Sequence, residues 1–379
     1  MRRWISFSTP SERFSFFWRA KIAESVVRQY EDLDDETRGM ERVGTILRGR
    51  QFEPVEGRIV VDDNGRIERI EEESVDSDDI IVPAFVNAHT HIGDSIAKEA
   101  GEGLTLEELV APPDGLKHRL LRRTSRENLI EGMRRSLRYM QAGGTAACLD
   151  FREGDVAGVT ALREAAAGLE INALAFGRES IEAMEVGDGF GASGANDAVF
   201  DRERRATRDV GKPFGIHAGE VDSSDLHPAL DLDPEFLVHV VHPEPVHLER
   251  IEDSRVPIVV CPRSNLVTGV GVPPIDDLAD RTTLALGTDN VMLNSPSMFR
   301  EMEFVSKLTA LPAKEVLAMA TFHGAELAGL ESGVLEPGRT ARFFVLDGNS
   351  NNLAGVRDPV RAVVRRADVA DVREVVLEE

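Results

Sequence analysis

Short apolar runs alternate with longer amphipathic stretches through the middle of the chain. The apolar runs end at His91, near Asp150, at Phe176, near Gly189, at His217, at Val241, at Cys261 and at Gly287. Helical periodicity is predicted over residues 125–141, 156–167 and 313–328. Eight strands with intervening helices predict a (β/α)8 barrel, a fold whose reactive residues lie at the carboxyl ends of the strands.

The pattern at both ends of the chain is different and favours β-structure. Residues 43–73 hold short alternating runs, and Asn64-Gly65 between two of them is a hairpin signal. Similar runs occur at residues 342–347 and 362–364. We therefore predict that residues 43–82 and 333–379 form a small composite β-sandwich beside a barrel of residues 83–332.

Residues 1–42 show no pattern that ties them to the rest of the chain, and they include an acidic run at 31–36. We interpret them as an N-terminal extension. Two alternatives stay open, a disordered segment or a start assigned upstream of Met40.

The composition of the chain limits the classes of molecule that it can bind. Of 379 residues 42% are hydrophobic and 29% charged, which is typical of a globular protein. A net charge of −23 argues against nucleic acid and anionic membranes as partners, because both require a basic face. Arginine supplies nearly all the positive charge, and the acidic excess suggests the hypothesis of a halophilic protein in a salt-rich cytosol.

The two cysteines, Cys148 and Cys261, each lie in an apolar stretch, which favours reduced core residues over a disulfide. No apolar run reaches the roughly 18 residues of a membrane span. Charged residues interrupt the segment after the basic start, so we expect no signal peptide. These features predict a cytoplasmic protein.

The strongest chemical signal follows the apolar run at residues 83–87. His89 and His91 stand two positions apart at the end of this predicted strand, so both imidazoles face the same side and can reach one ion. A His-x-His pair alone is weak evidence, because many proteins carry one at the surface. Its place at a strand end strengthens the interpretation.

Three further predicted strand ends carry polar groups. His217 ends one strand, with Glu220 three positions later; His239 lies near the end of the next; and Asp289 follows the run at 283–287. Each has an ordinary explanation, such as a hydrogen-bonded core histidine or an acid at a helix start. Polar groups at four predicted strand ends, in this order along the chain, are hard to obtain by chance. We interpret these groups together as one metal site.

These segments resemble the amidohydrolase superfamily, and most of all its branch of cytosine deaminases, S-adenosylhomocysteine deaminases and chlorohydrolases. The likeness runs from about residue 43 to 347 and includes the stretches 83–91, 217–220, 237–242, 260–265, 286–289 and 333–338. Residues 340–343 depart from the Ala-Asp pair that relatives usually have there, so the substrate is not carried over securely.

The resemblance implies that His89, His91, His217 and Asp289 bind one divalent metal ion, with zinc expected and iron as the alternative. Relatives with two metals bridge them with a lysine or glutamate on the fourth strand, and residues 171–200 contain no lysine. A single metal is therefore favoured. The nearby glutamates that keep a two-metal site open are Glu179, Glu182 and Glu185.

The predicted reaction is hydrolytic deamination of a heterocyclic amine, such as a nucleobase, nucleoside or purine-like compound, by a metal-activated water. Glu220 would carry a proton from water to a ring nitrogen, His239 would orient the nucleophile, and Asp289 would also accept a proton. The alternatives are a cyclic amide or imide hydrolase, similar to dihydroorotase or imidazolonepropionase, and a catalytically silent barrel.

Residues 98–118 follow the first barrel strand and are predicted to cover the active site. Side chains on this segment and after later strands are candidate contacts for a small-molecule substrate: Lys117, His118, Arg152, Arg178, Arg263 and Asn265. For Lys117 and His118 a solvated loop charge is the alternative. The resemblance also leaves a homo-oligomer open.

Overall fold

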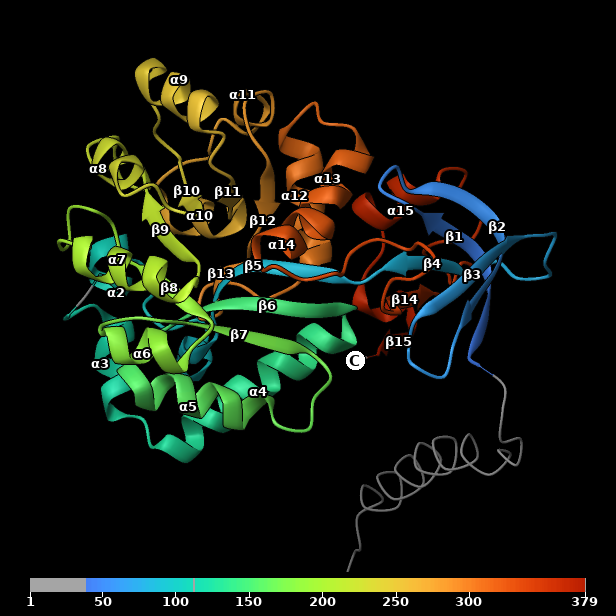
Figure 1. Ribbon diagram of the computed structural model, residues 1–379, viewed down its shortest axis with the longest axis horizontal. Helices are drawn as coiled ribbons and strands as arrows, with labels where there is room; N and C mark the ends of the chain where they lie inside the picture. Colours follow the sequence, from blue (N-terminus) through green and yellow to red (C-terminus); the bar gives the residue numbers. More distant parts are fainter. Residues whose placement is uncertain (1–38, 112, 379) are drawn as a thin grey trace, which may run out of the picture. The chain divides into compact units, whose positions relative to one another are not determined.

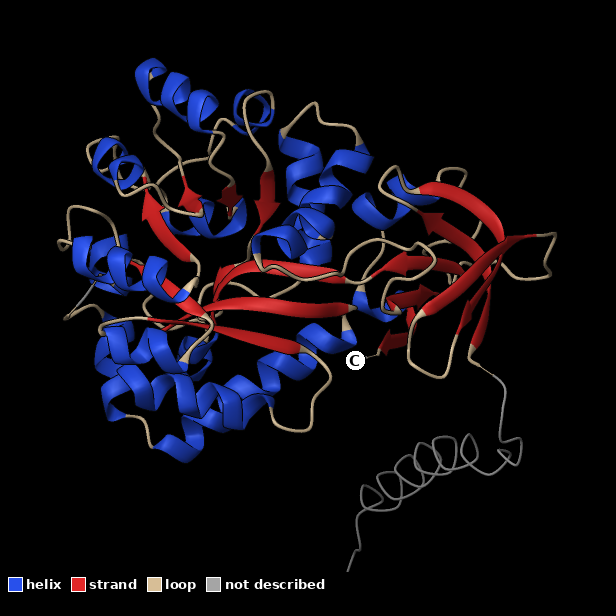
Figure 2. Ribbon diagram, viewed as in Figure 1, coloured by secondary structure: helices blue, strands red, loops and turns tan. Residues whose placement is uncertain are grey.

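The computed structural model describes residues 39–111 and 113–378, and its largest feature is a nine-stranded parallel sheet wrapped by helices (Figures 1 and 2). Its hydrogen-bonded order is β12-β11-β10-β9-β8-β7-β6-β5-β13. The strands are β5 (Phe85–His91), β6 (Thr145–Arg152), β7 (Asn172–Gly177), β8 (Gly189–Ala192), β9 (Phe214–Ala218), β10 (Phe236–His239), β11 (Ile258–Val260), β12 (Leu284–Leu286) and β13 (Asp289–Asn290).

The sheet closes through its last two strands. β12 pairs with β11, whereas β13, which begins three residues after β12 ends, pairs with β5. Because β12 and β13 form one interrupted strand, the sheet has eight strand positions and its two edges meet. The predicted (β/α)8 barrel is thus confirmed. The fourth strand was misplaced, however, since β8 begins at Gly189 instead of ending there.

Helices cover the outer face of the barrel, as α4 and α5 do beside β6 and β7 in Figure 1. Their bounds are η1 (Ile92–Ala97), α2 (Leu106–Val110), α3 (Leu116–Arg123), α4 (Arg126–Ala142), α5 (Asp155–Ala166), α6 (Ile181–Val186), α7 (Asp201–Val210), α8 (Leu226–Asp231), α9 (Pro245–Ser254), α10 (Pro262–Thr268), α11 (Ile275–Ala279), α12 (Met298–Leu308), α13 (Ala313–Ala320) and α14 (Phe322–Leu327). The helix predicted over 313–328 is broken, because Thr321 adopts the non-helical angles φ −125° and ψ −103°.

Both ends of the described chain contribute to a second, six-stranded sheet, ordered β15-β14-β4-β1-β2-β3. Its strands are β1 (Glu41–Arg48), β2 (Glu53–Val61), β3 (Ile67–Glu72), β4 (Ile80–Pro83), β14 (Arg342–Leu346) and β15 (Val372–Leu377). Antiparallel pairing of β14 with β4 joins the two terminal segments, as expected, and Asn64-Gly65 lies in the β2–β3 hairpin. The exact domain boundaries stay a prediction.

The β-run predicted at 362–364 is wrong. These residues lie in helix α15 (Pro359–Arg365), which precedes the short helix η2 (Val369–Asp371). The Asp358 side chain accepts a hydrogen bond from the Arg361 backbone amide, and Pro359 occupies the first turn, where its missing N–H costs nothing. These two start signals outweigh the β-propensity of the valines.

Three phenylalanines fill the barrel interior. Phe151 contacts Phe176 and Phe236 with ring centroids 5.6 and 6.1 Å apart. Its ring also lies 4.6 Å from that of His89. A Cβ at Gly215 would lie 2.8 Å from Phe151 and 2.3 Å from Phe236, so only glycine leaves room for these rings. The aromatic layer therefore forms a packed floor under the strand ends.

The extension predicted for residues 1–42 falls outside the described residues as far as residue 38, and its two alternatives stay predictions. The ordered sheet begins at Glu41, slightly earlier than expected. Among the described residues, no helix is both long and apolar enough to cross a membrane.

Candidate metal centre

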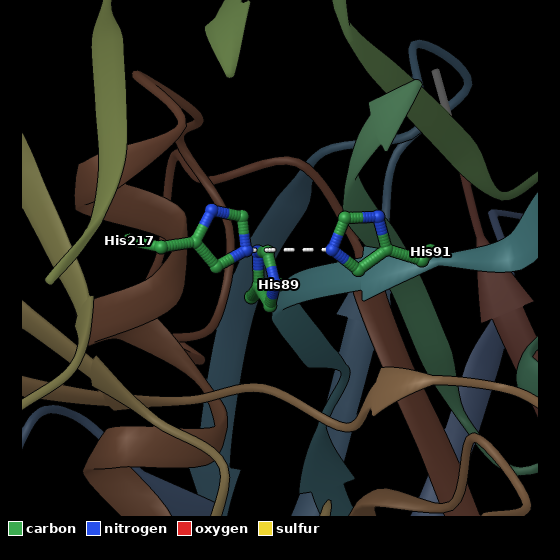
Figure 3. A group of neighbouring side chains, drawn as sticks. All are labelled: His89, His91 and His217. Carbon is green, nitrogen blue, oxygen red and sulfur yellow. Dashed lines mark hydrogen bonds between the residues drawn. The ribbon is translucent and has the colours of Figure 1, made fainter. Parts of the chain in front are cut away.

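Three imidazoles converge at the carboxyl ends of β5 and β9 (Figure 3). His89 and His91 share one face of β5, as their spacing predicts. The Nε2 atom of His91 lies 3.4 Å from Nε2 of His217. Ligand atoms of all three histidines lie within 4.8 Å of one another, which is close enough for one ion to touch them all.

Asp289 reaches the same point from β13, the strand that pairs with β5. Its Oδ1 lies 3.4 Å from Nε2 of His89 and 3.6 Å from Nε2 of His91. The backbone of Asp289 has φ +57°, a left-handed conformation that costs about 1–3 kcal/mol for a residue other than glycine. The four predicted ligands, His89, His91, His217 and Asp289, are therefore brought together.

The donor set suits a divalent cation. His217 Nδ1 donates to the Ala192 carbonyl at 2.8 Å and His91 Nδ1 to the Phe151 carbonyl at 3.0 Å, which leaves both Nε2 atoms free to bind an ion. Both ring nitrogens of His89 are buried and, within the described chain, have no hydrogen-bond partner. An unpaired buried polar group costs about 1–3 kcal/mol, so this imidazole needs a ligand.

Burial keeps these imidazoles neutral, the form that binds metal. It lowers the pKa of His91 to about 3 and holds the pKa of His217 well below its ordinary value. The pKa of His89 is likewise lowered by burial. Three neutral imidazoles and one carboxylate would leave coordination positions for water or substrate.

Glu220 and His239 stand beside this centre. Oε2 of Glu220 lies 3.6 Å from Nε2 of His239, and a ligand atom of His239 falls within 4.8 Å of His89 and Asp289. Burial raises the pKa of Glu220 above its ordinary value. A carboxyl group so placed, with a raised pKa, is suited to accept and release a proton.

The first turn of helix α10 supports two of these groups. Ser264 Oγ donates to Asp289 Oδ2 at 2.6 Å, and Asn265 Nδ2 donates to His239 Nδ1 at 3.1 Å. A neutral His239 that accepts at Nδ1 carries its proton on Nε2, toward Glu220. Asn265 is thus hydrogen-bonded to His239, and its predicted contact with substrate stays a prediction.

Arg263 also departs from its predicted place at the rim. The side chain is buried, and its Nε lies 2.6 Å from Oε2 of Glu301, which is itself fully buried on α12. Its terminal nitrogen donates to the Ser295 carbonyl at 2.6 Å. Arg263 therefore anchors α10 to α12, because a buried guanidinium needs partners for its donors.

A buried ionic cluster surrounds Glu153, which follows β6. Its Oε1 lies 2.5 Å from Lys117 Nζ, 3.0 Å from His91 Nδ1 and 3.3 Å from Arg178. Its Oε2 lies 2.6 Å from Arg152. Burial opposes ionisation of Glu153, but Lys117, His91 and Arg152 hold its pKa well below the usual range.

Two expectations are corrected by this cluster. Lys117 is only 3% exposed, so the alternative of a solvated loop charge is wrong for it. Arg152 is 1% exposed and also pairs with Asp150 at 3.2 Å, so it lies beneath the rim and not on it. The charge pattern along the chain gave no sign of this burial, because partners from distant segments create it.

A cavity of about 320 Å³ is lined by residues that contact the centre, although none of the four proposed ligands is among its lining residues. It is lined by His118, Glu153, Arg178, Ser193 and Phe200 together with Ala192, the residue whose carbonyl accepts from His217. His118 and Arg178 are thus the predicted substrate contacts that face open space. A larger groove of about 760 Å³, between the turn at 51–54 and residues 306–314 and 357–365, includes none of the metal-centre residues.

Sequence reasoning missed several residues around the centre. Asp150 was noted only as a strand end, yet its Oδ1 accepts from the Ile92 backbone amide at 2.6 Å and so fixes the chain just after His91. Asp94 is fully buried, with one oxygen that has no partner in the described chain. Strand-end position was an available signal for Asp150, whereas nothing in the pattern marked Asp94.

The glutamates considered for a second metal lie outside the proposed centre, and so does Lys212, the lysine that precedes the His217 strand. Lys212 Nζ donates to the carbonyl oxygens of Met184, Glu185 and Gly187 at 3.1, 2.6 and 2.8 Å, so it caps the end of α6. Glu179 accepts from the Gly154 backbone amide at 3.4 Å. Within the described chain, two sets of side chains are close enough to share a metal ion, His89 with His91 and His217, and His89 with His239 and Asp289. Neither set contains Glu179, Glu182 or Glu185.

Comparisons with known proteins agree with this geometry. The model of the amidohydrolase family matches residues 80–207 and 200–376. A putative aminohydrolase of Methanothermobacter thermautotrophicus is 34% identical over 87% of this chain and 95% of its own length. A 5-methylthioadenosine/S-adenosylhomocysteine deaminase of Haloarcula marismortui is 25% identical over 84% of each chain.

A solved structure shows the same fold. The atrazine chlorohydrolase of Arthrobacter aurescens TC1, complexed with zinc, superimposes with a TM-score of 0.74 at 20% identity and covers 90% of this chain and 93% of its own. The aminohydrolase and deaminase relatives confirm the expected enzyme class, a hydrolase of carbon–nitrogen bonds other than peptide bonds. The chain belongs to the amidohydrolase family.

Proposed function

We propose that this protein hydrolytically deaminates a heterocyclic amine, with one divalent cation held by His89, His91, His217 and Asp289. The observation that carries the proposal is the convergence of these four groups with Glu220 and His239 at one end of the barrel. The names of the relatives support deamination, and a nucleobase, nucleoside or purine-like compound is the proposed substrate class.

Zinc is the proposed metal, with iron as the alternative, because imidazole nitrogen and carboxylate oxygen suit both ions. A bound divalent cation would supply Lewis acidity that makes water nucleophilic near neutral pH. Proton transfer and orientation of the reactants are assigned to the side chains around it.

Glu220 is proposed to take a proton from the attacking water and pass it to a ring nitrogen of the substrate. Its raised pKa suits both steps, since the group must accept and release a proton within one turnover. His239, held at Nδ1 by Asn265, presents its Nε2–H to the developing negative charge on oxygen. Asp289 is proposed to accept the second proton of the water and to return it to the amino group, which then leaves as ammonia.

The cavity beside His217 is proposed to hold the part of the substrate that does not react. Phe190 and Phe200 offer it aromatic surface, and His118 and Arg178 offer polar groups. Lys117, Arg152, Arg263 and Asn265 already have buried partners, so we do not propose them as first contacts. A cytoplasmic location, salt adaptation and oligomeric state stay predictions from the sequence.

The test is metal analysis of protein purified in high salt, followed by assays for ammonia release from cytosine, guanine, adenosine-type and pterin-type compounds. Glu220→Gln should keep the metal and lose about 10²–10⁴-fold in turnover, the usual contribution of general acid–base catalysis. Glu249→Gln, an exposed glutamate on α9, is the matched control.

Two outcomes would contradict the proposal. Full activity of the Glu220→Gln variant would show that Glu220 is not the proton shuttle. Ring opening without ammonia release would favour the cyclic amide or imide hydrolase instead.

A further inference from the structure

Lys117 is the one buried residue of helix α3, whose other residues are half-buried or exposed. Its side chain is 3% exposed, whereas Arg119, Arg122 and Arg123 on the same helix α3 are exposed. Ordering a lysine side chain costs about 1.5–2 kcal/mol, and its charge is buried only where partners compensate for lost water. The partners of Lys117 therefore indicate why it is there.

Those partners lie on both sides of β5, the strand that carries His89 and His91. The Lys117 Nζ atom lies 2.5 Å from Oε1 of Glu153, just after β6, and 3.2 Å from Oδ1 of Asn290 in β13. In the barrel, β6 and β13 are the two neighbours of β5. Lys117 thus links the carboxyl ends of the two strands that flank β5, from a helix that lies outside the sheet.

Each partner also contacts a proposed metal ligand. Glu153 Oε1 lies 3.0 Å from Nδ1 of His91, opposite the nitrogen that faces the centre. Asn290 Nδ2 donates to Asp289 Oδ1 at 2.8 Å, which fixes the rotation of that carboxylate. Groups of this kind orient metal ligands and keep an imidazole in the tautomer that binds the ion.

We propose that Lys117 is a positioning residue, which aligns the His91 imidazole through Glu153 and the Asp289 carboxylate through Asn290. Docking of helix α3 thereby prepares the centre to bind its divalent cation. The inference rests on the ligand set of the proposed function, and the substrate contact predicted for Lys117 from the sequence stays a prediction.

The variant Lys117→Met is expected to fold. Glu153 keeps two cationic partners without the lysine, since Arg152 and Arg178 lie 2.6 and 3.3 Å from its oxygens. Methionine is also long and apolar enough to fill the space that the lysine stem occupies. Circular dichroism and thermal unfolding of the metal-free protein check this before any binding is measured.

The main test is zinc affinity, measured by competition with a chromophoric chelator. Lys117→Met should bind Zn²⁺ about 10–100-fold more weakly than the unaltered protein, the usual effect of losing a group that orients a ligand. The visible spectrum of the Co²⁺-substituted protein should shift, and Lys117→Arg should recover part of the affinity because it keeps the charge. Arg123→Met on the exposed face of α3 is the control and should bind as the unaltered protein does.

Hydrogen exchange gives a second readout. Because coupling between two sites is reciprocal, Zn²⁺ should slow amide exchange in α3 of the unaltered protein, and this protection should be lost in Lys117→Met. If that variant keeps the zinc affinity and cobalt spectrum of the unaltered protein, the proposal is wrong, whatever happens to turnover. If the unaltered protein binds neither zinc nor cobalt, the proposed function is wrong. This outcome can be told apart from failure of the Lys117 proposal, because it is seen in the unaltered protein and does not depend on any variant.

Discussion

Charged side chains are buried at the barrel mouth, whereas in the six-stranded sheet they are partly exposed to solvent. At the mouth, Arg152 pairs with Asp150 and Arg263 with Glu301, and all four side chains are at most 6% exposed. In the sheet, Arg42 and Glu374 pair at 2.5 Å with side chains 34% and 35% exposed. The same residue types therefore carry very different desolvation costs.

Left-handed backbone at residues other than glycine is more frequent at the mouth than in the described part of the six-stranded sheet, where Phe52, in the β1–β2 turn, has φ +50°. At the mouth, His239, Val240 and Asp289 all have positive φ, between +50° and +78°, without being glycine. Such conformations persist only where the surroundings enforce them. The difference teaches that the mouth is held in an arrangement that chemistry requires, whereas the charges of the sheet mainly meet solvent.

The largest expected effect on stability comes from breaking a buried pair at the mouth. Arg263→Met leaves Glu301 buried without its cation and should lower the free energy of unfolding of the metal-free protein by about 3–5 kcal/mol. Denaturant titration measures this. The double variant Arg263→Met with Glu301→Leu should recover most of the loss, and a single-variant loss below about 1 kcal/mol would contradict the assigned burial cost.

Asn265→Ala should have an intermediate effect on stability and a clear one on turnover. It leaves His239 Nδ1 unpaired, which costs about 1–3 kcal/mol. The rate constant kcat should fall, by no more than the roughly 10²–10⁴-fold that proton transfer contributes, while KM changes little. Leu266→Ala, at the partly exposed neighbouring position, is the control, and an equal fall in both variants would refute a specific role for Asn265.

The smallest effect is expected in the sheet. Arg42→Ala removes the half-buried pair with Glu374 and should cost at most about 1 kcal/mol. The loss should shrink further as salt rises, because mobile ions screen exposed charges. Denaturant unfolding at two salt concentrations measures both the loss of stability and its dependence on salt. A large loss of unfolding free energy that does not depend on salt would contradict the difference between the sheet and the mouth.

The sequence alone was sufficient for residues whose position in a strand decides their role. His89, His91, His217 and Asp289 each end an apolar run, and parallel strands bring their carboxyl ends to one place. The terminal segments also pair as expected, since the apolar pattern of β4 and β14 requires a partner strand.

Roles that depend on partners from distant segments were not accessible in this way. Lys117 and Arg152 are typical solvated charges by pattern, and only their contacts with Glu153 and Asp150 make them buried. The break at Thr321 and the helix at 362–364 were missed for a related reason, because local propensity is weak compared with packing and capping.

The order of apolar and polar positions thus determined the barrel, the shared terminal sheet and the set of groups that converge at the barrel mouth. Only the tertiary structure decided which charges are buried, which side chains contact the proposed ligands, and which candidates face the cavity. Periodicity records the direction in which a side chain points within its own element, whereas burial and hydrogen bonding depend on what the rest of the fold places opposite it.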